Sequence, residues 1–308
     1  MRQPPLTTDR IATAAIVVLV IVAATTATAA PAEPTAAPTL SLPIAAFLGA
    51  IQGATEFLPV SSSGHLALAQ AWLSVDPNAA GHRFNIVVHA GTLLAVLWLY
   101  RTDVRALASV VVRPLDDTPD RRMLIAMVVA TLPLGLAVLP GVEPFVVMLE
   151  QSPRYVGIAL LVTASVLALA FRRSGPVPDE PNRAAPTLPA AAGVGLAQLL
   201  AVVPGISRSG STIAAGLAIG LDREQAARFS FLISIPAIAG ATVLEGLKVI
   251  RAPSAGDIPW AAYALGFATS FVVGLVCLRW LLVLVRGGKI TGFVVYLAIV
   301  GSIAIALG

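Results

Sequence analysis

The chain contains 308 residues, of which 57% are hydrophobic and only 12% are charged, and its formal net charge is +4. Apolar runs this long and frequent exceed what a soluble core of this size needs, so the composition indicates an all-α, polytopic membrane protein and excludes a soluble domain. No basic stripe is interleaved with exposed aromatic residues, so we expect no nucleic-acid partner. A single cysteine, Cys277, excludes a disulfide framework and a cysteine metal cluster.

The N-terminal region is set apart from the rest of the chain. Residues 1–30 contain two arginines and then an apolar run that fades into small residues. This pattern is typical of a secretory signal peptide, and it equally suits an extra N-terminal transmembrane helix. Residues 31–41, rich in proline, alanine and threonine, are expected to form a linker.

The first apolar segment is broken by polar residues. Residues 42–58 form an apolar stretch that ends at Pro59 and a run of serines, and a second apolar piece covers only residues 64–73. A helix rises ~1.5 Å per residue, so the second piece spans about half of a ~30 Å hydrocarbon core. The pair therefore predicts a re-entrant hairpin, which enters the membrane, breaks and returns to the same face.

The same pattern recurs later in the chain. Three predicted spans (84–100, 123–139 and 155–171) and a polar, cytoplasmic linker (173–186) are followed by a second broken pair (188–203 and 210–221) and three more spans (229–249, 260–285 and 290–307). A shift of 146 positions places Gly49 on Gly195, Gln52 on Gln198, Ser61 on Ser207, Ser63 on Ser209 and Gly64 on Gly210.

These matches predict two repeats, residues 42–172 and 187–308, each with one re-entrant hairpin and three transmembrane helices. Because each repeat crosses the membrane an odd number of times, the second is inverted, and the hairpins are expected to meet near the midplane. The arginine-rich loop after Tyr100 predicts a cytoplasmic side there, so the first hairpin enters from outside. Lys248 and Arg251 are exceptions, because this topology leaves them outside.

The two polar breaks, residues 52–65 and 204–212, are the candidate site, because polar groups are costly in hydrocarbon and are kept there for function. Each second half-helix would direct free N–H groups and a positive dipole end toward an anion. Arg208 adds a planar, charged fork that suits phosphate oxygens. Ser207, Ser209 and Thr212 add hydroxyl groups that can donate hydrogen bonds.

The first break supplies the complementary chemistry. Ser62 or Ser63 is the candidate nucleophile, and His65 is its candidate base or an acid for the leaving group. Direct attack by water, or by His65 itself, is the alternative. Glu56 lies one helical turn after Gln52, so both would face one hard cation, Mg²⁺ or Ca²⁺. Together these groups form a phosphoryl-transfer constellation.

Each feature also has a structural interpretation. A serine-rich break is more often a turn than a nucleophile, and an intramembrane arginine pairs structurally about as often as it binds substrate. We expect His82 and His89 to form core hydrogen bonds and Gln198 to bond to backbone. The position of the polar residues at matched breaks favours the functional interpretation.

The breaks resemble the two signatures of the undecaprenyl-diphosphate phosphatase (BacA) family. Residues 52–65 match (E/Q)-x-x-x-E followed by P-V-S-S-(S/T)-G-H, and residues 204–212 match P-G-x-S-R-S-G-x-T. The resemblance covers about residues 42–308. It implies six spans with two re-entrant hairpins, and removal of the terminal phosphate of undecaprenyl diphosphate, which regenerates the lipid carrier for peptidoglycan synthesis and confers bacitracin resistance.

Carried over by position, the resemblance implies a set of active-site residues and a divalent cation: Glu56, Ser61, Ser62, His65, Ser207, Arg208, Ser209 and Thr212. It implies a bacterial plasma-membrane protein in contact with lipids, with its chemistry facing outward, and it leaves a homodimer open. Many members have Glu where this chain has Gln52, so we expect metal binding that is weaker or that rests on Glu56 and substrate oxygens.

Two other functions need to be weighed. A polyprenyl-phosphate flippase or anion transporter is the alternative, because inverted repeats with broken helices are transporter architecture. A carrier needs anion ligands but no serine beside a histidine, so the pair Ser62 and His65 favours an enzyme. Membrane phosphatases of the phosphatidic-acid type need a further histidine after the Ser-Arg piece, and none follows His89.

Overall fold

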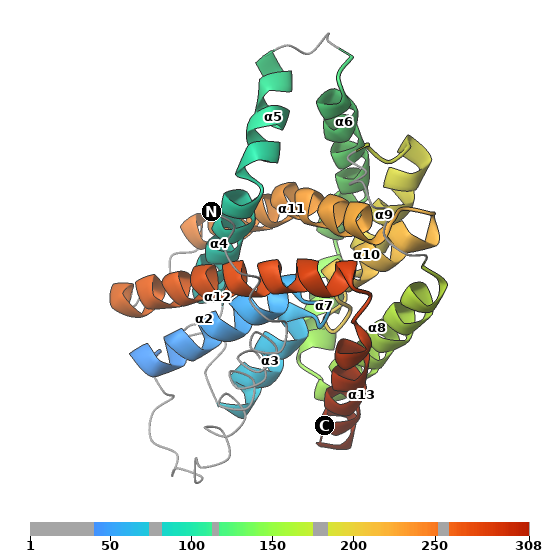
Figure 1. The fold of residues 1–308 in the computed structure, drawn as a ribbon. Coiled ribbons are helices and arrows are strands. Elements are labelled where there is room, and N and C mark those ends of the chain that lie inside the picture. Colours follow the sequence, from blue (N-terminus) through green and yellow to red (C-terminus); the bar gives the residue numbers. More distant parts are fainter. Residues whose placement is uncertain (1–39, 74–81, 113–116, 175–183, 252–258, 308) are drawn as a thin grey trace, which may run out of the picture.

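The computed structural model describes residues 40–73, 82–112, 117–174, 184–251 and 259–307, and every regular element among them is helical (Figure 1). The predicted all-α class is therefore confirmed for this part of the chain. The predictions for residues 1–30 and for most of the linkers 31–41 and 173–186 lie outside the described residues.

The described residues of the first half form eight helical elements: α2 (Leu42–Phe57), α3 (Ser62–Trp72), α4 (His82–Leu99), α5 (Arg101–Val112), α6 (Pro119–Thr131), the 3-10 helix η2 (Leu132–Val138), α7 (Val142–Glu150) and α8 (Pro153–Arg173). Those of the second half form five: α9 (Leu188–Leu200), α10 (Arg208–Ala218), α11 (Arg223–Arg251), α12 (Trp260–Arg286) and α13 (Thr291–Leu307). Both predicted breaks are present, between α2 and α3 and between α9 and α10.

Two helices form where the sequence indicated loops. The arginine-rich segment after Tyr100 forms α5, which bends away from α4 by 86°. Leu107 and Val110 are its buried side chains, so α5 is an amphipathic helix. It was not predicted because its polar residues interrupt the apolar run. The outer segment before Arg154 likewise forms α7.

The helix lengths are those of a polytopic membrane protein. Among the described residues, four helices are long and apolar enough to cross a membrane: α6 with η2, α8, α11 and α12. The bent pair α4 and α5 makes a fifth if it counts as one span, and α13, α2 and α9 are shorter apolar helices.

Close packing positions the first break. α2 lies alongside α12, and α8 lies alongside α13 (Figure 1). A Cβ atom on Gly53 would lie 2.6 Å from the carbonyl oxygen of Ser270 and 2.8 Å from the nitrogen of Gly274, so only glycine allows this approach of α2 to α12. Small residues at helix crossings allow the close packing by which helices associate in lipid, where the hydrophobic effect does not drive their association. The contact lies one turn before Glu56.

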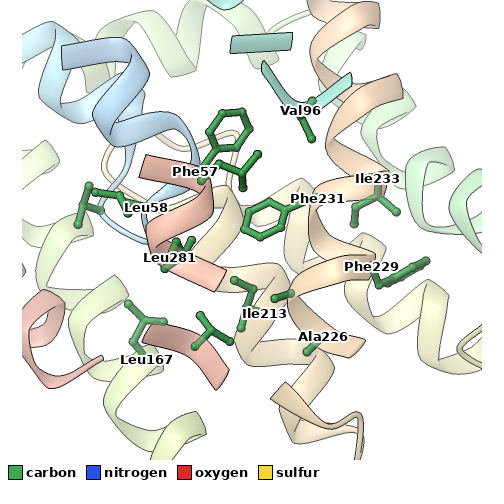
Figure 2. Close-up of a cluster of buried hydrophobic side chains, with 14 of the residues drawn as sticks. Phe57, Leu58, Val96, Leu167, Ile213, Ala226, Phe229, Phe231, Ile233 and Leu281 are labelled. Carbon is green, nitrogen blue, oxygen red and sulfur yellow. The ribbon is translucent and has the colours of Figure 1, made fainter. Parts of the chain in front are cut away.

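The two broken pairs share one apolar cluster (Figure 2). Phe57, at the end of α2, packs edge-on against Phe231 of α11, with ring centroids 6.0 Å apart. Ile213 of α10 and Leu58 in the first break belong to the same cluster. Both breaks are therefore held in one packed region.

Candidate active site

The first break turns sharply at Ser61. This residue has φ of 72°, the left-handed region that non-glycine residues rarely adopt, and it is buried. Its Oγ accepts a hydrogen bond from the nitrogen of Gly64 at 3.4 Å, so it caps the N-terminus of α3. Local strain of this kind persists where surrounding contacts enforce it, and it is common at functional sites.

The second break repeats these local interactions. Ser207 caps α10, its Oγ accepting from the nitrogen of Gly210 at 3.1 Å. The Oγ atoms of Ser207 and Ser209 lie 3.2 Å apart, and those of the matched pair Ser61 and Ser63 lie 3.4 Å apart. The left-handed residue here is Gly205, with φ of 95°, and a Cβ atom on it would lie 2.6 Å from Ala159 Cβ.

The two breaks touch each other. Ser209 Oγ donates to the carbonyl oxygen of Leu58 at 3.1 Å, which bonds one break to the other. Arg208 Nη2 donates to Glu56 Oε1 at 2.6 Å, across 152 positions of sequence. The predicted convergence of Arg208 with residues 52–65 is confirmed by this ion pair.

Glu56 is the centre of the polar cluster. Its Oε2 accepts hydrogen bonds from Ser62 Oγ at 2.7 Å and from Gln52 Nε2 at 2.9 Å. His89 Nε2 lies 3.8 Å from the same oxygen. Both carboxylate oxygens are thus occupied by donors, which fixes the carboxylate and holds the Ser62 hydroxyl in one direction.

One guanidinium nitrogen of Arg208 is available to bind a ligand. Its Nη1 atom is buried and has no hydrogen-bond partner among the described residues. A buried, permanently charged N–H group is costly unless an acceptor joins it. A phosphate oxygen is an acceptor that would satisfy it, since guanidinium and phosphate pair with two parallel hydrogen bonds.

His65 has other partners than the predicted serine. Its Nδ1 lies 2.8 Å from the carbonyl oxygen of Ser61, which can only accept, so Nδ1 carries a hydrogen. Its Nε2 lies 2.8 Å from the hydroxyl of Tyr296 on α13. The structure therefore places Glu56, and not His65, in contact with Ser62, because the turn at Ser61 directs the imidazole toward α13.

The other predicted hydroxyls are buried behind the cluster. Ser207, Ser209 and Thr212 are each 1% exposed, and their hydroxyl groups bond within the protein. Thr212 Oγ1 donates to the carbonyl oxygen of Arg208 at 2.8 Å and is hydrogen-bonded to Ser230 Oγ at 2.6 Å. These bonds fix Arg208 in place, and direct contact of the three hydroxyls with substrate stays a prediction.

Some polar partners were not recognised from the sequence. His89 was expected to form a core hydrogen bond, and its Nδ1 does bond to the carbonyl oxygen of Asn85 at 2.7 Å, but its Nε2 faces Glu56. Tyr296 was missed altogether, although a hydroxyl inside the apolar run of α13 was a signal. Gln198 bonds to the carbonyl oxygen of Ala130 at 3.2 Å, as predicted. The side chain of His82 lies outside the described ones.

Comparison with known proteins identifies the family of the chain. The family model described as bacitracin resistance protein BacA matches residues 45–303. The chain is 40% identical over 274 residues to an undecaprenyl-diphosphatase of Rubrobacter xylanophilus, covering 87% of this chain and 98% of the relative. It is 39% identical to one of Methanobrevibacter smithii (84% and 95% covered) and 35% identical to one of Bacteroides fragilis (85% and 97%). The match includes both breaks and nearly the full length of these relatives, and the chain therefore belongs to the BacA family.

Proposed function

We propose that this chain is an integral-membrane phosphatase that hydrolyses undecaprenyl diphosphate to undecaprenyl phosphate and inorganic phosphate. This reaction recycles the lipid carrier of peptidoglycan synthesis and confers bacitracin resistance. The observation that carries the proposal is the cluster of Arg208, Glu56 and Ser62, which joins the two breaks inside an apolar scaffold. Relatives covering most of the chain are named undecaprenyl-diphosphatase.

The reaction follows from the positions of these groups. Arg208 Nη1 and the N-terminus of α10 bind oxygens of the terminal phosphate. Either Ser62 Oγ or a water molecule that it orients attacks the terminal phosphorus, and Glu56 accepts the proton of the attacking hydroxyl. The bond from phosphorus to the bridging oxygen breaks, and undecaprenyl phosphate leaves. If Ser62 is the nucleophile, water then hydrolyses the phosphoserine.

A divalent cation, Mg²⁺ or Ca²⁺, belongs to this proposal. Gln52 Oε1 is buried and has no partner among the described residues, so an amide oxygen is free to bind a hard cation beside Glu56. No group of three or more His, Cys, Asp or Glu residues is placed to hold a metal in the described part of the chain. The cation would therefore rest on Glu56, Gln52 and phosphate oxygens, and it would neutralise charge on the phosphate.

The membrane arrangement is also proposed. It consists of six transmembrane helices and two re-entrant hairpins in an inverted repeat, with the site on the outer side of the bacterial plasma membrane. The matched serine caps of the two breaks support the repeat. Lys248, one of the two exceptions to the charge rule, pairs with Glu143 at 2.7 Å, so an acid from the predicted outer segment balances it.

Phosphate release in detergent tests the function. Glu56→Ala and Arg208→Ala should each lower release from a C55 diphosphate by about 100-fold or more, because the first removes the proposed base and the second removes a charge that stabilises the transition state. His65→Ala should also lower release, because it removes the hydrogen bond to the carbonyl oxygen of Ser61 beside Ser62. Arg122→Ala, whose exposed guanidinium pairs with Asp117, is the matched control and should keep normal activity. Normal turnover by Arg208→Ala would refute the assigned site, and an intact diphosphate with wild-type protein would favour the flippase or anion transporter.

A further inference from the structure

His65 and Tyr296 form a pair that bridges α3 and α13. Their rings stack with centroids 5.5 Å apart and an interplanar angle of 16°, and the Tyr296 hydroxyl lies 2.8 Å from His65 Nε2. Because Nδ1 carries a hydrogen, Nε2 of the neutral imidazole is an acceptor, and the tyrosine hydroxyl donates to it. The contact therefore fixes both the ring plane and the tautomer.

α8 packs against both of the helices that carry the pair. A Cβ atom on Gly301 of α13 would lie 2.8 Å from the carbonyl oxygen of Gly157, and one on Gly157 would lie 2.6 Å from that of Gly301, so the two backbones touch. On α3, a Cβ atom on Gly64 would lie 3.2 Å from Val156 Cγ1. The tyrosine hydroxyl thus stands at a position set by helix packing.

His65 in turn holds the strained turn. Its Nδ1–H donates to the carbonyl oxygen of Ser61, the left-handed residue that immediately precedes Ser62. Ser62 Oγ, at the start of α3, then donates to Glu56. Tyr296, His65 and Ser61 therefore form a chain of two hydrogen bonds that ends at the carbonyl oxygen of Ser61, one peptide bond before the residue proposed to attack or to orient water.

We propose that Tyr296 is a positioning residue, which with His65 braces the left-handed turn at Ser61 and keeps the Ser62 hydroxyl on Glu56. This role rests on the proposed phosphatase function and assigns His65 a task other than that of the base for Ser62. Both ring nitrogens of His65 are occupied, one by the Ser61 carbonyl and one by the tyrosine hydroxyl. Glu56 is the group that contacts the Ser62 hydroxyl.

Kinetics of single and double variants test the brace. Tyr296→Phe keeps the ring and loses only the hydroxyl, so kcat should fall about 10-fold with little change in KM, and the pH profile of kcat/KM should keep its shape, because no proton-transfer group is removed. In a His65→Gln background the same substitution should lower kcat less than about 2-fold, because residues that act as a unit are not additive. Tyr155→Phe, on the exposed face of α8, is the matched control and should match wild type.

Three outcomes would overturn the proposal: wild-type kcat in Tyr296→Phe, a displaced limb in its pH profile, or effects of Tyr296→Phe and His65→Gln that multiply. A readout independent of activity separates the brace from the phosphatase function. In protein with ¹⁵N-labelled histidine, His65 and His89 should both carry a hydrogen on Nδ1, because the Nδ1 of each bonds to a backbone carbonyl oxygen. The Nε2 resonance that is absent in His65→Gln belongs to His65, and it should shift in Tyr296→Phe. An unshifted Nε2 resonance in Tyr296→Phe refutes the hydrogen bond, even if the phosphatase assignment stands.

Discussion

At the residue scale, Glu56 has more partners than a metal ligand alone requires. One oxygen accepts from Arg208, and the other accepts from Ser62 and Gln52. A buried carboxylate is tolerated when it is paired and hydrogen-bonded in this way. The same bonds orient the hydroxyl and the guanidinium, so a substitution at Glu56 should disturb both phosphate binding and attack.

Ser62 and Ser63 are neighbouring hydroxyls with different surroundings, which gives a matched comparison. Ser62 donates to Glu56 at 2.7 Å, whereas Ser63 has a 3.4 Å contact with Ser61 Oγ. Ser62→Ala should therefore lower kcat about 100-fold or more, and Ser63→Ala less than about 10-fold. Initial rates of phosphate release measure both, and an equal loss in the two variants would contradict the assignment.

Gln52 should influence the cation concentration that the activity of the protein requires. With Gln52→Glu, two carboxylates would face each other one helical turn apart, and like charges at this spacing repel unless a cation lies between them. We expect half-maximal activity at a free Mg²⁺ or Ca²⁺ concentration about 10-fold lower than in wild type. Titration of the cation after EDTA treatment checks this, and an unchanged curve would argue against a cation at these side chains.

At the element scale, helix crossings decide where the first break lies. α2 reaches α12 at Gly53, and Glu56 follows within one turn of the same helix. The break cannot move without moving this crossing, because helices in lipid are held by close backbone contact and hydrogen bonds. The position of the site is thus a property of helix packing as well as of the motif.

Gly53→Ala tests this crossing. The added Cβ would meet backbone atoms of α12 at 2.6 and 2.8 Å, so we expect a loss of about 1–3 kcal/mol in stability and a clear loss of activity as Glu56 is displaced. Thermal unfolding followed by tryptophan fluorescence measures the first effect. Gly193→Ala, in α9 with no atom within 4 Å of its added Cβ, should be neutral or gain up to about 1 kcal/mol. Equal stability of both variants would refute the close crossing.

At the scale of the whole molecule, charges mark the two ends of the helices. Arg228 pairs with Asp103 and Arg286 with Glu224, at the end predicted to be cytoplasmic. At the other end, Lys248 is paired with Glu143. Lys248 remains an exception to the positive-inside rule, because that rule counts Lys and Arg and gives neighbouring acids little weight.

Cysteine labelling tests the orientation. The native Cys277 is buried, so exposed single cysteines can be read against an unreactive background. A membrane-impermeant maleimide should label Gln151→Cys in intact spheroplasts, and should label Ser109→Cys, on α5, only after the membrane is permeabilised. The reverse pattern would invert the proposed topology, and labelling of wild-type protein would show that Cys277 is accessible.

The sequence alone determined the helical class, the two breaks and the chemistry gathered at them. These features are local, because apolar run length and the placement of proline, glycine and serine decide where a membrane helix starts and stops. Apolar run length does not predict α5, because the charged residues of this amphipathic helix interrupt its apolar positions.

Only the tertiary structure decided the partner of each side chain. Arg208 meets Glu56 across 152 positions, and His65 meets Tyr296 across 231, and both contacts depend on how separate helices cross. The sequence paired Ser62 with His65 because they are neighbours in the chain. The turn at Ser61 has a left-handed φ, and beyond it Ser62 Oγ bonds to Glu56 whereas His65 Nε2 bonds to Tyr296 of α13. No local pattern in the sequence records these partners.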